Sequence, residues 1–268
     1  MNQEKFLPLN GINWSIQKIP LSVSKEGNKQ ISSYYNIIRT DKGIILGSCT
    51  DQRVIKQNSA VFAEVKKVAK RFELKVRNAH LLDSGKHIVF KLYPIDNIFQ
   101  LKRLQEPGDG KVTKCINIIY HHDSGKYNVQ NAYTFQVLDG NDIQSILKVP
   151  YNDSLDVMVN DAIIKDAEIE LSLFKMVEEI SSKKFEHEIV SFLFKLHENK
   201  TSRKLKYKND LLDIINKTKD KSDLGLFMAI SKYAFEKFPV KDHNASIHLG
   251  KAQELIDRAY YFIINNYN

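Results

Sequence analysis

Three short turns of the form Asp-x-Gly, each between two runs of β-forming residues, constrain the fold of this chain most. The turns lie at residues 41–43, 83–85 and 123–125. In such turns Asp accepts hydrogen bonds from nearby backbone amides, and Gly takes the positive φ that the reversal needs. The flanking runs are rich in β-branched and aromatic residues; they cover residues 32–38, 44–48, 74–82, 87–92, 113–122 and 127–137. The sequence therefore predicts antiparallel β-hairpins in the first half of the chain.

A helix is predicted between the first two hairpins. Asn58 or Ser59 can cap its N-terminus, because both side chains accept hydrogen bonds from free backbone amides. Apolar residues recur at helical spacing, and basic residues fall on the opposite face. The apolar residues are Val61, Phe62, Val65, Val68 and Phe72, and the basic residues are Lys66, Lys67, Lys70 and Arg71. We therefore expect this helix to bury its apolar face on the sheet.

The second half of the chain changes to helical periodicity. Pro and Gly predict a loop over residues 94–112, and a second break is predicted at 139–142. Helices are expected over residues 160–181, 185–198, 209–218, 223–237 and 249–264, with a basic, exposed linker at 202–208. The predicted fold class is α+β: an antiparallel β-hairpin sheet with one packed helix, followed by a helical C-terminal part. Residues 1–150 are expected to form a basic β-rich domain and residues 151–268 a helical domain, unless the two form one compact unit.

Positive charge is concentrated in the first half. The net charge is +8; residues 1–150 hold 22 basic and 13 acidic residues, whereas the remainder holds 18 and 19. Such an asymmetry indicates a polyanionic partner for the first half. The alternative is that the basic surface serves solubility alone.

The most basic stretch runs from residue 53 to residue 77. Its acidic residues are Glu64 and Glu73, and its eight basic residues are Arg53, Lys56, Lys66, Lys67, Lys70, Arg71, Lys75 and Arg77. Lysines on one helix face, with arginines at its ends, can follow a phosphate backbone through salt-sensitive contacts that are largely independent of base sequence. We therefore predict that these eight residues bind nucleic acid, DNA in particular; a solvated helix face is the alternative.

Aromatic residues of the predicted strands offer a second kind of contact. Tyr34, Tyr35 and Tyr127, together with Tyr120 and Tyr133, lie in these strands. Aromatic side chains on a sheet can stack on unpaired bases, so Tyr34, Tyr35 and Tyr127 are candidates for base stacking. The alternative is that they form cross-strand packing pairs.

Two adjacent histidines, His121 and His122, are followed by Asp123 and invite a catalytic or metal-binding interpretation. Histidine titrates near neutral pH, and an Asp can orient it. Neighbouring residues of a strand point to opposite faces, however, so the two histidines are not expected to share a metal ion. His122 and Asp123 are therefore the residues that a catalytic interpretation would use, and no metal ligand is predicted.

Motifs for common cofactors are absent from the sequence. The chain has no His-Glu-x-x-His, no Gly-x-x-x-x-Gly-Lys, no dinucleotide-type glycine-rich turn and no Gly-x-Ser-x-Gly. No cofactor is therefore expected, and a non-enzymatic role is favoured. Cys49 and Cys115 lack metal-like spacing and are expected to be reduced. No stretch is long and apolar enough to span a membrane, and no secretory signal is expected, so the predicted location is the cytoplasm.

Short motifs follow one another in order along residues 11–137. They are Gly11-Ile12-Asn13-Trp14 followed by Pro20; Arg39-Thr40-Asp41-Lys42-Gly43 followed by Leu46-Gly47; Gln57-Asn58 with Phe62; Ser84-Gly85-Lys86; and His122-Asp123-Ser124-Gly125. In order and spacing they resemble the phage- and plasmid-like family called domain of unknown function 932. The segment from Leu226 to Ala234 is similar to a helix near the family's C-terminal end, whereas the family's Cys- and Asn-rich segment is not found here. The resemblance implies a mobile element of a bacterial host cell, often beside genes of DNA metabolism, and implies no known catalytic residue.

These observations favour a non-enzymatic nucleic-acid-binding protein of a phage or plasmid. Its expected partner is DNA, with single strands as one candidate, in the replication or recombination of a mobile element. One alternative is a metal-dependent nuclease, whose ligands need not be adjacent in sequence. Another is a protein-interaction factor, such as an inhibitor of host defence, that uses the helical half. No membrane partner is expected, and a homo-oligomer, such as a ring or filament, is left open.

Overall fold

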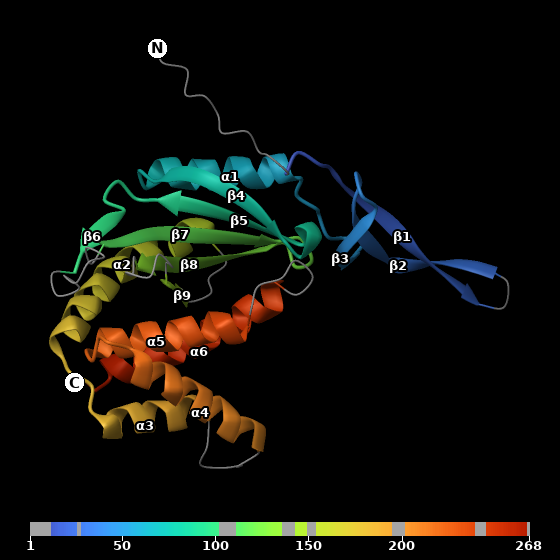
Figure 1. The fold of residues 1–268 in the computed structure, drawn as a ribbon. Helices are drawn as coiled ribbons and strands as arrows, with labels where there is room; N and C mark the ends of the chain where they lie inside the picture. Colours follow the sequence, from blue (N-terminus) through green and yellow to red (C-terminus); the bar gives the residue numbers. More distant parts are fainter. Residues whose placement is uncertain are drawn as a thin grey trace.

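The computed structural model describes residues 12–25, 28–101, 111–135, 143–148, 154–194, 202–238 and 245–266. It confirms the predicted α+β class, with two antiparallel sheets followed by helices. Figure 1 shows the larger sheet lying between helix α1 and the C-terminal helices, while the smaller sheet projects to one side. We call the smaller sheet the arm.

The arm consists of β1 (Ile16–Lys25), β2 (Asn28–Arg39) and β3 (Ile44–Thr50), in the order β1-β2-β3. Its predicted turn is present, and Gly43 has a φ of 63° there. Residues of these strands and of the segment before them form a small apolar core, against which Leu81 of the larger sheet packs; the core consists of Trp14, Ile16, Ile37, Leu46 and Cys49. The base of the arm is thereby fixed to the rest of the molecule.

The larger sheet has the order β4-β5-β7-β8-β9, with the short strand β6 paired to β7. Its strands are β4 (Lys75–Leu82), β5 (His87–Tyr93), β6 (Ile98–Gln100), β7 (Lys111–His121), β8 (Lys126–Phe135) and β9 (Ile143–Lys148). The other two predicted hairpins are confirmed, and their glycines, Gly85 and Gly125, have φ values of 106° and 70°. The predicted loop over 94–112 is wrong in part, because β6 and the start of β7 lie within it.

Helix α1 (Asn58–Arg71) packs on one face of the larger sheet, as predicted. Helix α2 (Leu155–Glu178) shares that core through Met158, Val159 and Ala162. The predicted cap of α1 is wrong: Gln57 occupies the N-cap position without a capping hydrogen bond from its side chain. The amide of Asn58 instead donates to the carbonyls of Ile12 and Trp14.

The remaining helices are α3 (Lys183–Leu193), α4 (Ser202–Lys217), α5 (Asp223–Lys237) and α6 (Ala245–Ile264). Together with the second part of α2 they enclose a core that also includes Leu101, Val112, Tyr133, Phe135 and Leu147 from the sheet region. The linker predicted at 202–208 is wrong, because α4 already begins at Ser202. The break predicted at 139–142 lies outside the described residues. Among the residues described, no helix is long and apolar enough to cross a membrane.

Candidate nucleic-acid interface

The first two basic residues of the predicted binding segment interact with other groups of the protein. The guanidinium of Arg53 donates hydrogen bonds to the backbone carbonyls of Asp123 and His122, the latter at 2.7 Å. The ammonium of Lys56 pairs with Glu64 at 2.7 Å and lies 5.4 Å from the centre of the Tyr127 ring. Because these charges have partners inside the molecule, Arg53 and Lys56 are poorly placed to contact phosphates.

Helix α1 shows the predicted amphipathic arrangement. Val61, Val65, Val68 and Ala69 are buried against the sheet. The four basic residues of the opposite side, Lys66, Lys67, Lys70 and Arg71, are exposed. Arg71 nevertheless pairs with Asp156 of α2 at 2.8 Å, so the second half of the chain neutralises one of these charges.

A tight connection carries the basic surface from α1 into β4. The Leu74 amide donates to the Ala69 carbonyl at 2.8 Å, and Glu73 adopts a φ of 55°, so the chain reverses at once. Lys75 is the first residue of β4, which is an edge strand of the sheet. Arg77 follows at a register shift, and its guanidinium lies 4.8 Å from the centre of the Tyr93 ring.

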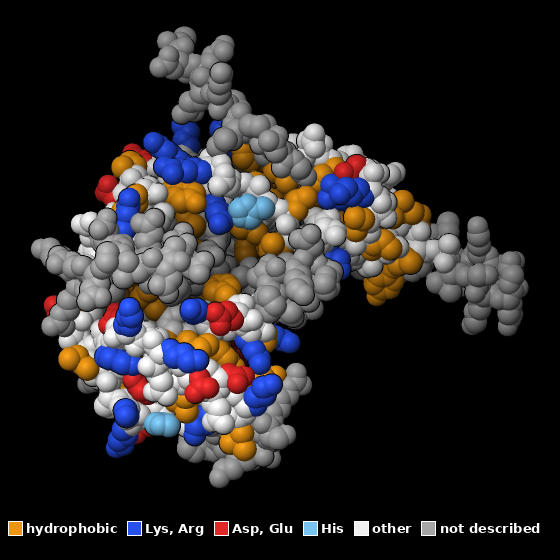
Figure 2. Space-filling model, viewed as in Figure 1, with side chains coloured by type: hydrophobic (Ala, Val, Ile, Leu, Met, Phe, Trp, Pro, Cys, Tyr) orange, Lys and Arg blue, Asp and Glu red, His pale blue; other side chains and the backbone are white. Residues whose placement is uncertain are grey.

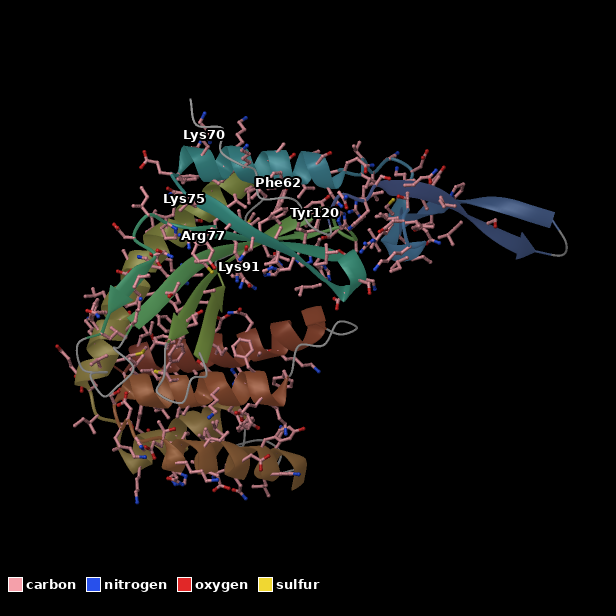
Figure 3. The ribbon with its side chains drawn as sticks, turned by 45° about the horizontal axis from the view of Figure 1, so that its top comes forward. Phe62, Lys70, Lys75, Arg77, Lys91 and Tyr120 are labelled. Atoms are coloured by element: carbon pink, nitrogen blue, oxygen red, sulfur yellow. The ribbon has the colours of Figure 1, made fainter. Side chains whose placement is uncertain are left out.

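Lys91 of β5, which sequence analysis did not select, extends the basic residues around β4 to the sheet face opposite α1, because its neighbours Phe90 and Leu92 pack under α1. It is paired with Asn78 of β4 and is partly exposed. Figure 3 shows Lys70, Lys75, Arg77 and Lys91 following one another from α1 over β4 to β5. We call these four residues the cationic edge. Within the described ranges, none of the four forms a salt bridge.

The charge of Lys91 also acts on the strand beside it. Burial lowers the pKa of His80 on β4, and the Lys91 ammonium lowers it further. His80 is therefore neutral at pH 7 and adds no charge to the cationic edge.

The helical part of the molecule differs from the cationic edge in its surface charge. Over the helical part of the face drawn in Figure 2, Lys and Arg are interspersed with Asp and Glu.

The three tyrosines proposed for base stacking lie in different environments. Tyr34 is 55% exposed on the arm, whereas Tyr35 is partly buried with the Lys18 ammonium 5.5 Å from its ring centre. Tyr127 is buried, its hydroxyl donates to Glu64 at 2.6 Å, and its ring packs on Tyr120. Tyr127 is therefore not available to stack on a base, and Tyr34 is the accessible one of the three.

His122 and Asp123 lie where the β7–β8 turn meets the arm. The His122 ring is 1% exposed and packs between Trp14 and Tyr120, at centroid distances of 5.5 and 5.0 Å. Burial is the main reason that its pKa falls to about 4. A side chain so enclosed cannot reach a substrate. As predicted, His121 lies on the opposite face of the strand, where it contacts His87.

Residues that carry the family resemblance meet at this same junction. The guanidinium of Arg39 lies 4.5 Å from the Trp14 ring centre and pairs with Asp41 at 2.6 Å. A Cβ on Gly85 would lie 3.0 Å from Trp14, and a Cβ on Gly47 would lie 2.7 Å from that of Asp123. Close packing between the arm and the larger sheet thus accounts for these residue types.

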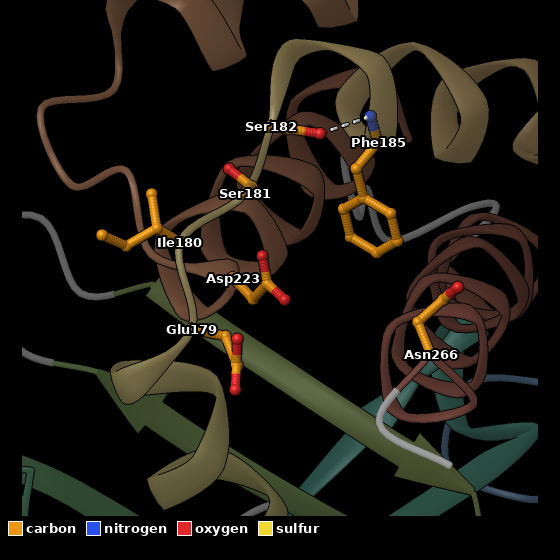
Figure 4. A pocket seen from close by; sticks show the side chains of 7 residues that line it. All are labelled: Glu179, Ile180, Ser181, Ser182, Phe185, Asp223 and Asn266. Atoms are coloured by element: carbon orange, nitrogen blue, oxygen red, sulfur yellow. Dashed lines mark hydrogen bonds between the residues drawn. The ribbon is translucent and has the colours of Figure 1, made fainter.

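An open pocket of about 370 Å³ lies in the helical part. Figure 4 shows its lining, which comprises Glu179, Ile180, Ser181, Ser182, Phe185, Asp223 and Asn266. Ser182 caps α3 there by accepting a hydrogen bond from the Phe185 amide at 3.2 Å. The lining holds two carboxylates and no basic side chain, so this pocket does not suit a polyanion.

No protein-family model, no curated protein and no solved structure matches this chain. The resemblance noted from short motifs consequently stays a prediction.

Proposed function

We propose that this protein binds nucleic acid, DNA in particular, through the cationic edge, and that it does so without catalysing a reaction. The observation that carries the proposal is the run of exposed or partly exposed basic residues, Lys70, Lys75, Arg77 and Lys91, on adjacent elements and without salt bridges to the described residues. Basic side chains grouped in this way neutralise phosphates and release their counterions. The family resemblance supports a role in the replication or recombination of a phage or plasmid.

The exposed lysines of α1 can extend this contact. Lys67 lies on the solvent side of the same helix as Lys70. A backbone crossing α1 and β4 would meet Lys67 before the cationic edge. Such contacts position a nucleic acid without reading its bases, so we expect weak dependence on sequence.

Protection of the edge strand is the competing explanation for these charges. An edge strand exposes unpaired backbone groups, and lysines there discourage pairing with other chains. That explanation predicts no affinity for nucleic acid, so a binding measurement separates the two.

The test is a fluorescence-anisotropy titration of the full chain with labelled single- and double-stranded DNA at several salt concentrations. The triple variant Lys70→Gln, Lys75→Gln, Arg77→Gln should bind more weakly. Its slope of log affinity against log salt should be smaller by about 2 to 3, close to one for each phosphate that the variant no longer neutralises.

The matched control removes the same charge elsewhere. Lys183, Lys217 and Lys232 are exposed on α3, α4 and α5, and their change to Gln lowers the net charge equally. This control should bind nearly as tightly as the wild type. If the wild type does not bind at low salt, or if both triple variants bind alike, the cationic edge is not the binding surface.

A homo-oligomer also stays a prediction. Light scattering of the full chain tests it by measuring the molar mass.

A further inference from the structure

Two histidines and a carboxylate from separate parts of the chain come together at one end of the larger sheet. His87 of β5 and His121 of β7 are direct partners in the antiparallel register, and their ring centroids are 4.6 Å apart. Asp123 follows in the turn between β7 and β8. One ligand atom from each of the three residues lies within 4.8 Å of the others.

We propose that His87, His121 and Asp123 bind a divalent transition-metal ion, such as Zn²⁺. Imidazole nitrogens together with a carboxylate oxygen form a ligand set that such ions favour. Ligand atoms bound to one ion at about 2.1 Å lie roughly 3 to 4 Å apart, so separations of at most 4.8 Å leave only a small adjustment for binding. Asp123 is exposed, which allows that adjustment.

The ring of His87 is already oriented for a ligand. Its Nε2 lies 3.2 Å from the Asp83 carboxylate. A metal-binding histidine commonly donates a hydrogen bond from its other ring nitrogen to a carboxylate in this way. The remaining nitrogen, Nδ1, is buried and has no hydrogen-bond partner among the described residues, and His87 as a whole is only 6% exposed. A buried nitrogen without a partner is costly, and a metal ion would satisfy it.

The ring of His121 also has a hydrogen-bonding neighbour on its Nε2. Its Nε2 lies 2.9 Å from the side-chain amide nitrogen of Asn128. The oxygen and nitrogen of an amide are exchanged by a flip, so Asn128 can also accept the ring N–H of His121. Both histidines would then present Nδ1 to the same ion.

The ion would fix the turn of the larger sheet against which the arm packs. Asp123 packs directly against Gly47 of β3, and its backbone carbonyl accepts a hydrogen bond from Arg53. Fixing the Asp123 side chain would therefore fix the turn that the arm contacts. Because the metal ion would bind the folded chain and not the unfolded chain, it should raise the Tm of the protein.

The test uses the full chain without an affinity tag, stripped of metal with a chelator and titrated with Co²⁺. The wild type should develop a saturable visible absorption at one equivalent, and Zn²⁺ should displace it. The variants Asp123→Asn and His121→Asn should weaken binding at least about tenfold. Asp123→Asn changes an exposed side chain and keeps the backbone contact with Arg53, so it is expected to fold.

The controls replace the same residue types elsewhere. Asp96→Asn and His187→Asn change exposed residues outside the cluster and should bind Co²⁺ as the wild type does. A second readout is the Tm of the wild type, which should rise with Zn²⁺ and fall back on chelation. Absence of saturable Co²⁺ binding by the wild type, or equal binding by Asp123→Asn and Asp96→Asn, would overturn the proposal.

Discussion

The side-chain nitrogen of Asn58 binds the chain that precedes the arm, although the residue lies in the first turn of α1. Its side-chain amide donates to the carbonyls of Ile12 and Trp14 at 3.0 and 3.1 Å, and the residue is 3% exposed. Asn58→Ala would leave both carbonyls without these donors, so we expect it to lower the free energy of unfolding by about 2 to 4 kcal/mol. Urea denaturation measures this decrease.

The neighbouring residue supplies the control at the same scale. Ser59 is exposed in the same helical turn, and Ser59→Ala should change the free energy of unfolding by no more than about 0.5 kcal/mol. Equal effects of the two substitutions would show that the hydrogen bonds of Asn58 contribute little.

Two residues of the candidate sites, His87 and Lys91, could not be predicted from the sequence. His121 and His122 were compared with each other because they are adjacent, but the residue opposite His121 is His87, from another hairpin. Lys91 was missed for the same reason, since its place beside β4 follows from strand register. Cross-strand neighbours depend on pairing over long sequence distances, which local patterns do not encode.

Among the elements, the arm meets the larger sheet at a contact that leaves no room for a side chain. A Cβ on Gly47 would lie 2.7 Å from the Asp123 Cβ, which is closer than real contacts. Gly47→Ala should therefore push β3 away from the β7–β8 turn and cost about 1 to 3 kcal/mol. Trp14, the one tryptophan of the chain, packs at this junction, so its fluorescence should report the displacement.

Gly43→Ala tests the positive φ that glycine allows, in the turn between β2 and β3. Gly43 has a φ of 63°, and a Cβ added there would meet no atom within 4 Å beyond its chain neighbours. Alanine there should cost about 1 kcal/mol through its backbone conformation alone, with Trp14 fluorescence unchanged. If Gly47→Ala also leaves the Trp14 emission unchanged, the contact with Asp123 does not hold the arm in place.

The elements that sequence analysis found are those whose signals are local. The hairpin turns were predicted from Asp and Gly, and α1 from its repeat of valines. The strand β1 was missed because Pro20 interrupts it; the structure accommodates Pro20 at a register shift in an edge strand, where proline is tolerated. The basic composition of residues 202–208 suggested a linker, but helix propensity and packing of the later turns extend α4 through them.

For the molecule as a whole, α2 joins the two halves of the chain. Its first turns contribute Met158, Val159 and Ala162 to the core beneath α1. Polar contacts also link α2 to the larger sheet: the Tyr133 hydroxyl donates to Asp166 at 2.6 Å, and the Lys114 ammonium pairs with the same carboxylate at 2.8 Å. The sheet in turn supplies Phe135 and Leu147 to the core of the helical part.

A boundary at residue 150 would therefore divide two cores. A fragment of residues 1–150 lacks the apolar residues of α2 and exposes Tyr133, Phe135 and Leu147, which the helices cover. Since burial of such side chains supplies roughly 1.5 to 3 kcal/mol each, exposing these three costs an amount comparable to the whole stability of a typical domain. We expect the fragment to show no cooperative thermal transition by circular dichroism, in contrast to the full chain. A cooperative melt of the fragment near the Tm of the full chain would instead establish residues 1–150 as an independent domain, and α2 would then be a docked helix without a structural role in the sheet.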